Sequence, residues 1–193
     1  MSEVEPGSAQ HHRVEGAGRL GTWLLIASLS MLFGAAVVGY VLIRVRAPEW
    51  PPPGSPPLPA GVWISTALLV AASALLFLAE RAFRSDQEER ATRTLFVTVL
   101  VAVAFLASQV SCWMRMAADS VLPQQSLLVW GFYTLTFLHA VHVLAGLVPL
   151  ILVAIRARRG RYTPDDHDGV HFVAMYWHFL LVSWVVILAV LAF

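Results

Sequence analysis

Three histidines lie in the interior of long apolar stretches of this sequence, and they are its main candidates for chemistry. Imidazole suits haem iron, copper and zinc, so His139, His142 and His178 could hold a redox centre. His139 and His142 share one face of a helix, and two residues on one helix face cannot supply axial ligands to both faces of a haem. Helical rise places His142 about 19 Å from residue 155 and His178 about 10 Å from residue 171, the ends expected on the same side of a membrane. This difference in depth disfavours a shared haem.

A structural role is the alternative interpretation of these histidines. An unpaired polar group in hydrocarbon costs several kcal/mol. We therefore expect each imidazole to hydrogen-bond a neighbouring helix or a lipid headgroup, and we expect Gln109 to join helices in the same way. The single cysteine, Cys112, excludes disulfides and cysteine-rich metal sites. The polypeptide itself is expected to bind no haem, copper or zinc.

The elements that carry these residues are predicted to be membrane-spanning helices. Apolar residues make up 58% of the 193 residues and charged residues 13%, against about 25% charged in a typical soluble domain. This composition excludes a disordered chain, a nucleic-acid-binding protein and nearly all soluble domains. A helix crosses a bilayer with roughly 20 apolar residues. Five runs without Asp, Glu, Arg or Lys fit that length: residues 22–43, 62–79, 95–113, 127–155 and 171–193. The predicted fold is an all-α integral membrane protein with five transmembrane helices.

The arginines predict the orientation of these helices. Ten of the 13 arginines lie in the N-terminal segment or in the second and fourth loops, and three lie on the opposite side. Because basic residues concentrate on the cytoplasmic side, the N-terminus is predicted to be cytoplasmic and the C-terminus to lie on the outer, periplasmic face. Residues 1–19 are predicted to be a polar tail and residues 20–193 a single membrane domain. Four arginines beside helix ends are candidates for binding lipid headgroups: Arg81, Arg84, Arg156 and Arg158.

Three strings in the sequence resemble one membrane family. Residues 20–34 resemble the first helix of the short, five-helix bacterial subunit III of haem–copper (cytochrome c) oxidases. Residues 137–146 are similar to a Gly-Phe-His-x-x-His-Val-x-x-Gly stretch of that family. Residues 176–179, followed by Trp184, are similar to its terminal Tyr-Trp-His-Phe-Val-Asp-x-x-Trp signature. The strings occur in the family's order, and the resemblance covers about residues 20–193.

The resemblance implies an accessory subunit of a respiratory terminal oxidase in the bacterial cytoplasmic membrane. Such subunits pack on the catalytic subunit I, bind phospholipid, and support proton uptake and durable turnover, while the partner subunits hold haem and copper. Trp177 and Trp184 would join the histidines as inter-helix contacts. The first two helices are expected to pair, with the other three as a second group.

The chain departs from the family pattern at four positions that are often acidic: Leu29, Cys112, His171 and Leu181. Either those carboxylates are dispensable for assembly, or this is a divergent branch with altered proton or lipid handling. An accessory subunit of nitric oxide reductase is an alternative function. A small b-type cytochrome is another, and it rests on the membrane histidines alone. An independent lipid or solute carrier is disfavoured, because the spans contain no charged or unwound site.

Overall fold

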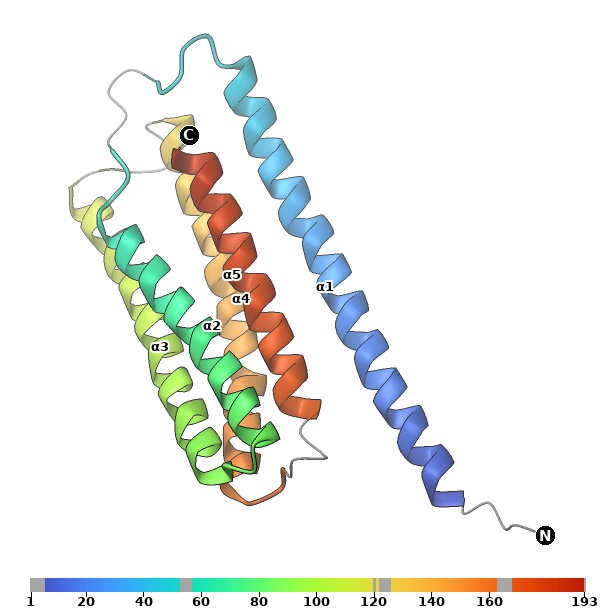
Figure 1. The fold of residues 1–193 in the computed structure, drawn as a ribbon. Helices are drawn as coiled ribbons and strands as arrows, with labels where there is room; N and C mark the ends of the chain where they lie inside the picture. Colours follow the sequence, from blue (N-terminus) through green and yellow to red (C-terminus); the bar gives the residue numbers. More distant parts are fainter. Residues whose placement is uncertain (1–5, 53–56, 120, 122–125, 163–167, 193) are drawn as a thin grey trace.

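The computed structural model describes residues 6–52, 57–119, 121, 126–162 and 168–192, with side chains from residue 18 onward. These residues contain no strand. They form five helices (Figure 1): α1 (Pro6–Arg46), α2 (Gly61–Arg84), α3 (Glu88–Ala118), α4 (Leu127–Arg158) and α5 (Asp168–Ala192). All five are long and apolar enough to cross a membrane. The predicted all-α membrane fold is therefore confirmed, and each predicted apolar run falls on one helix.

The helices extend beyond the apolar runs. α1 begins at Pro6, so its helical backbone reaches into the segment predicted as a polar tail. Once a span has formed a helix, each added residue gains a backbone hydrogen bond, and proline is tolerated in a first turn. α2 continues through Glu80 to Arg84, and α4 continues past residue 155 to Arg158. Helix ends therefore cannot be located from the ends of apolar runs.

One end of the bundle gathers arginines. α2 and α4 end there, α3 and α5 begin there, and α1 begins on the same side, whereas α5 ends at the opposite end (Figure 1). Three residues, 85–87, connect α2 to α3, and Asp86 adopts a left-handed conformation with φ of 57°. Aspartate is among the residues that tolerate this conformation. We call this region the arginine-rich end, defined by Arg81, Arg84, Arg90, Arg93, Arg156 and Arg158.

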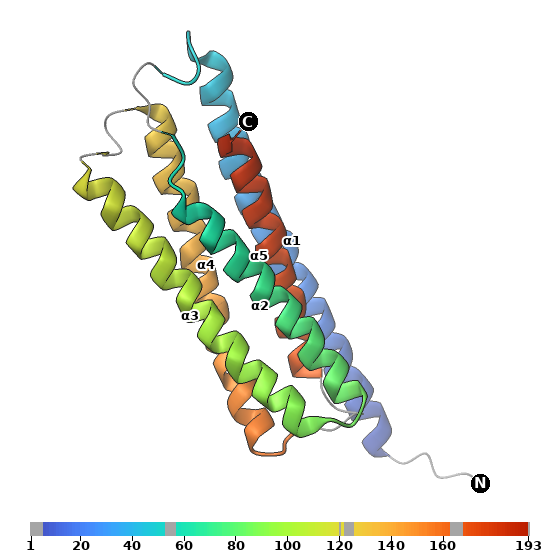
Figure 2. The same cartoon turned by 60° about the vertical axis from the view of Figure 1, so that its left-hand side comes forward.

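The helices α2 to α5 form a four-helix bundle, and α1 lies along its outer side. α2 packs against α3 and α5, and α4 packs against the same two helices. α1 packs against α5 and α4 (Figures 1 and 2). The expected pairing of the first two helices is wrong, because α1 and α2 do not pack together in the described part of the chain. Residues 47–60 separate them, and this length lets α2 begin away from α1.

Two buried aromatic side chains attach α1 to the bundle. The centroid of the Phe33 ring lies 4.9 Å from that of His142 and 6.1 Å from that of Phe179. Tyr40 packs against Gly131 of α4, where any Cβ would clash with the tyrosine ring. Only 11% of the most apolar part of α1 is buried, against 33–44% in the other four helices. α1 is therefore held through one narrow face.

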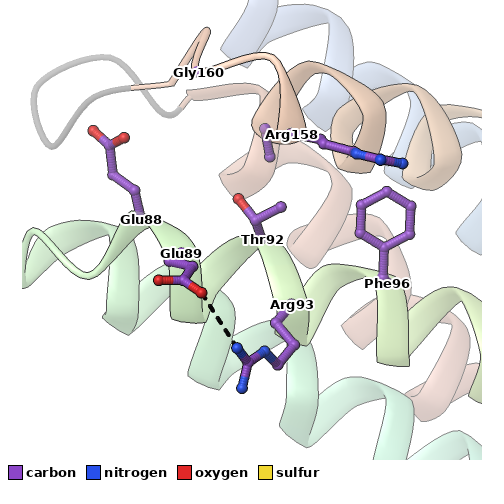
Figure 3. Close-up of a pocket in the computed structure, with 8 residues that line it drawn as sticks. Glu88, Glu89, Thr92, Arg93, Phe96, Arg158 and Gly160 are labelled. Atoms are coloured by element: carbon purple, nitrogen blue, oxygen red, sulfur yellow. Dashed lines mark hydrogen bonds and ion pairs between the residues drawn. The ribbon is translucent and has the colours of Figure 1, made fainter.

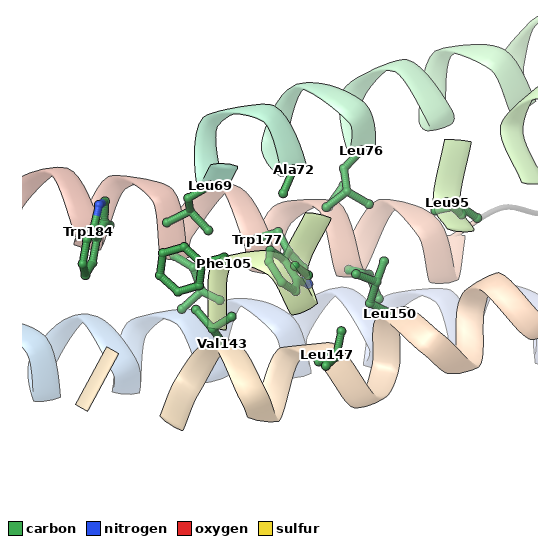
Figure 4. Close-up of a cluster of buried hydrophobic side chains, with 14 of the residues drawn as sticks. Leu69, Ala72, Leu76, Leu95, Phe105, Val143, Leu147, Leu150, Trp177 and Trp184 are labelled. Carbon is green, nitrogen blue, oxygen red and sulfur yellow. The ribbon is translucent and has the colours of Figure 1, made fainter. Parts of the chain in front are cut away.

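The core lies between α2, α3, α4 and α5, and all four helices contribute large side chains to it. Trp177 and Trp184 of α5 are almost fully buried in this core. Packing, rather than exclusion of water, drives helix association in a membrane, so these interlocking side chains define the bundle. Figure 4 shows the set, which includes Leu69, Ala72, Leu76, Leu95, Phe105, Val143, Leu147, Leu150, Trp177 and Trp184.

Candidate functional site

His139 of α4 is fully buried in a cage of rings. Its centroid lies 6.0 Å from that of Phe33, 5.9 Å from that of Phe105 and 5.0 Å from that of Trp184. Neither of its ring nitrogens has a hydrogen-bond partner among the described residues. The rings come from α1, α3 and α5, so His139 joins three helices through ring packing.

His142 faces a groove between α1, α4 and α5. Its Nδ1 donates to the carbonyl oxygen of Leu138 over 2.7 Å, which leaves Nε2 for the groove. The groove has a volume of about 360 Å³ and an apolar lining that includes Leu29 and Tyr176. Leu29 occupies one of the positions that the family pattern makes acidic. An acidic side chain there would share this groove with the His142 imidazole.

His178 belongs to a line of polar pairs between α2 and α5, which run antiparallel. We call this line the α2–α5 seam. It has three members: His171 Nδ1 donates to Glu80 Oε1 over 2.8 Å, Ser73 Oγ lies 2.6 Å from His178 Nδ1, and Trp184 Nε1 donates to Thr66 Oγ1 over 2.9 Å.

The spacing of the α2–α5 seam is regular. Its members are seven residues apart on α2, and seven and then six residues apart on α5. Two helical turns separate successive pairs, so the seam extends over about 20 Å. Seven-residue spacing is typical of two helices that cross at a small angle and keep one face in contact. The seam therefore fixes which residues of α2 face α5.

Glu80 is the site residue that sequence reasoning missed. It is only 9% exposed, and its Oε1 accepts hydrogen bonds from His171 and from Arg84, one turn further along α2. The apolar run on this helix was predicted to end at residue 79, so Glu80 was placed outside the membrane spans. The signal that could have found it is the seven-residue spacing of Thr66, Ser73 and Glu80.

Position 171 departs from the family pattern in an informative way. The pattern is often acidic there, whereas this chain has a histidine. The structure places the Glu80 carboxylate against that histidine, so the neighbouring helix supplies the acid. A carboxylate and an imidazole thus meet at this end of the α2–α5 seam.

Gln109 and Trp177 bond to other pairs of helices. Gln109 of α3 is buried, and its Oε1 accepts a hydrogen bond from Ser65 of α2 over 2.9 Å. Its Nε2 has no partner within the described ranges. Trp177 Nε1 donates to the carbonyl oxygen of Gly146 over 3.3 Å, which ties α5 to α4. These contacts link α2 to α3 and α4 to α5.

The four arginines predicted to meet lipid all lie at the arginine-rich end, but they have different surroundings. Arg84 forms an ion pair with Glu80. Arg156 lies in the last turn of α4. Arg81 lines a groove between α2 and α3, together with Arg90, which was not among the predicted residues.

Arg158 lies in a different groove, between the start of α3 and the end of α4 (Figure 3). This groove has a volume of about 550 Å³, and Glu88 and Glu89 also line it. Glu89 pairs with Arg93, one turn further along α3. The carboxylates give this groove a mixed charge, which is less suited to an anion than the groove beside Arg81.

The predicted histidines do not assemble a metal or haem site. No three His, Cys, Asp or Glu side chains of the described chain converge where a metal ion could bind. A haem held by two histidines needs two imidazoles that face one space. His139 faces aromatic rings, His142 faces the groove beside α1, and His178 faces Ser73 of α2. The b-type cytochrome alternative therefore has no support in this arrangement.

Comparison with known proteins identifies one family. The family model described as cytochrome c oxidase subunit III matches residues 6–193. The cytochrome c oxidase subunit 3 of Synechocystis sp. is 28% identical over 189 residues, which cover 96% of this chain and 80% of that protein. A probable cytochrome c oxidase subunit 3 of Nocardia farcinica is 29% identical, with coverage of 97% and 96%. The cytochrome bo(3) ubiquinol oxidase subunit 3 of Pseudomonas aeruginosa is 25% identical, with coverage of 96% and 90%.

Proposed function

Because this chain belongs to the cytochrome c oxidase subunit III family, we propose that it is a non-catalytic subunit of a bacterial respiratory terminal oxidase. In this role it stabilises the catalytic subunit I, which is its main contact, and it binds phospholipid. Haem and copper are held by the partner subunits. The three relatives described above are named as subunits of a cytochrome c oxidase or a ubiquinol oxidase, which favours an oxidase over a nitric oxide reductase.

The α2–α5 seam is the observation that carries the structural role. An unpaired polar group is costly in hydrocarbon, and the polar side chains of the seam find their partners on the neighbouring helix. His178, Ser73 and Trp184 all bond across the seam. Their side chains are therefore engaged in holding the bundle. A bundle with a fixed shape is what a supporting subunit needs.

The arginine-rich end supports a location in the bacterial cytoplasmic membrane with this end toward the cytoplasm. The opposite end carries Arg44, Arg46 and Arg115. The difference follows the preference of basic residues for the cytoplasmic side. The C-terminus of α5 then lies at the periplasmic face.

Purification of the native complex tests this function. The chain, carrying an affinity tag at its N-terminus, is expected to co-purify from its own membranes with a haem–copper subunit I. A chain that never co-migrates with such a subunit would contradict the proposal.

Spectroscopy of the separated subunit gives a second test. A reduced-minus-oxidised spectrum of the isolated chain is expected to show no haem band.

Turnover of the partner subunits gives a third test. The catalytic subunits purified without this chain are expected to start turnover but to inactivate sooner than the complete complex. In the spectroscopic test, a stoichiometric haem band on the isolated chain would indicate the b-type cytochrome instead.

A further inference from the structure

The groove between the inner ends of α2 and α3 brings two arginines together. It has a volume of about 330 Å³, and Arg81 of α2 and Arg90 of α3 both line it. The three-residue connection between these helices keeps the two arginines at the same end of the bundle. Because a guanidinium presents a planar fork of donors, two of them suit the oxygens of a phosphate group.

The other arginines of this hairpin are engaged with carboxylates. Arg84 pairs with Glu80, and Arg93 pairs with Glu89 over 3.3 Å. Within the described ranges, Arg81 and Arg90 have no ion pair, although Arg90 donates to the side chain of Gln87 over 3.2 Å. The two arginines that line this groove are therefore the arginines of the hairpin that are available to an external anion.

The remaining lining of this groove has the chemistry of a lipid site. Leu75 and Leu78 line it on the side toward the middle of the membrane, and Leu78 is 50% exposed. Ser85 and Gln87 line it at the opposite, aqueous side. An amphiphile would place its apolar chain along the leucines and its charged head between the arginines.

We propose that this groove, between Arg81 and Arg90, binds an anionic phospholipid of the inner leaflet through its phosphodiester group. The proposal deepens the lipid-binding part of the proposed function, because it names the site and the class of lipid. It also replaces the predicted set of four arginines with a pair drawn from two helices. Arg84 supports the seam instead, and Arg158 lies in the mixed-charge groove.

Native mass spectrometry of the purified complex, extracted from the membrane together with its bound lipids, tests this site. The complex is equilibrated with equal amounts of phosphatidylglycerol and phosphatidylcholine, and the lipid retained on this chain is read from its mass. Wild-type chain is expected to retain phosphatidylglycerol preferentially. Each arginine beside an anionic surface contributes about fivefold, so Arg81→Gln/Arg90→Gln is expected to lower that preference about twenty-five-fold.

A matched variant and a competitor complete the experiment. Arg93→Gln removes the same charge from the same hairpin outside the groove, and it is expected to leave the preference unchanged. Millimolar inorganic phosphate is expected not to displace the lipid, because it cannot use the leucines. If the double variant does not fold, the single variants supply the measurement, at about fivefold each.

Three results would overturn the proposal: no lipid preference in the wild-type chain, an equal preference in the double variant, or full displacement by free phosphate. The proposed oxidase role is judged separately, by whether subunit I is present in the same mass spectrum. A complex that contains subunit I but shows no lipid preference would reject the lipid site alone.

Discussion

At the scale of residues, the polar side chains of this protein differ in whether they bond another helix or their own. His178 bonds Ser73 on another helix, whereas Ser28 and Ser30 on α1 donate to carbonyl oxygens of their own helix. A hydroxyl in a membrane helix can satisfy itself in either way. Only the first kind of bond contributes to the association of helices.

Ser73→Ala removes the hydroxyl that bonds His178 and leaves the imidazole unpaired. We expect the free energy of unfolding in bicelles to fall by about 1 kcal/mol, which is within the range for hydrogen bonds between membrane helices. Ser28→Ala is the matched control, because its hydroxyl is exposed and bonds the carbonyl oxygen of Leu24. The control is expected to change the free energy of unfolding by less than about 0.5 kcal/mol. Equal losses in the two variants would contradict the role given to Ser73.

The sequence indicated which residues are polar within the spans, but it could not indicate their partners. Each membrane imidazole was expected to hydrogen-bond a neighbouring helix or a lipid headgroup, and Gln109 was expected to join helices in the same way, since hydrocarbon does not solvate them. This expectation is wrong for His139, which is fully buried and has no hydrogen-bond partner among the described residues. His178 meets a serine because α2 packs along α5, and His139 meets only rings because α1, α3 and α5 surround that part of α4. No local sequence pattern encodes either arrangement. Glu80 was missed because a helix is not required to end at its first charged residue.

At the scale of elements, helix existence was predictable and helix neighbours were not. Each apolar run had the length to cross a bilayer, so five helices followed from composition alone. The position of α1 depends instead on close contacts made by its buried aromatic side chains, and in one of them Tyr40 fills the space beside Gly131. A glycine at that point of α4 has meaning only once the opposing tyrosine is known.

Gly131→Leu is expected to displace α1 from the bundle, because the new side chain would occupy the position of the Tyr40 ring. Overpacking of this kind costs about 1–3 kcal/mol. Spin labels on Val38 of α1 and Val186 of α5, introduced after Cys112→Ala, measure the separation. The variant is expected to give a longer and broader distance distribution than the parent protein.

Gly34→Leu is the control for this experiment. Gly34 also lies on a helix, but a Cβ there would meet nothing within 4 Å. The Gly34→Leu distances are expected to match those of the parent. An unchanged distribution in Gly131→Leu would mean that Tyr40 does not hold α1 in place.

At the scale of the whole molecule, the family resemblance inferred from three short strings is confirmed by a match that covers residues 6–193. The order of the strings carried more information than any one of them, because each is short. The departures from the family pattern became interpretable only with the fold. Position 171 has its acid supplied by α2, and position 29 lies in the groove of His142.

The orientation of the whole bundle is a prediction that labelling can check. In a Cys112→Ala background, Arg46→Cys is expected to react with a membrane-impermeant maleimide added to intact spheroplasts. Arg90→Cys, at the arginine-rich end, is expected to react only after the membrane is opened, because positive charge favours the cytoplasmic side. If Arg90→Cys reacted in intact spheroplasts and Arg46→Cys reacted only after the membrane was opened, the bundle would have the opposite orientation to the predicted one.

The α2–α5 seam has a mechanical consequence. Sliding α5 along α2 by one turn, about 5.4 Å, would separate all three pairs at once. The two helices are therefore expected to move together along their whole contact, from the Glu80–His171 pair to the Thr66–Trp184 pair. The three bonds together therefore oppose a relative displacement of the two helices along the membrane normal.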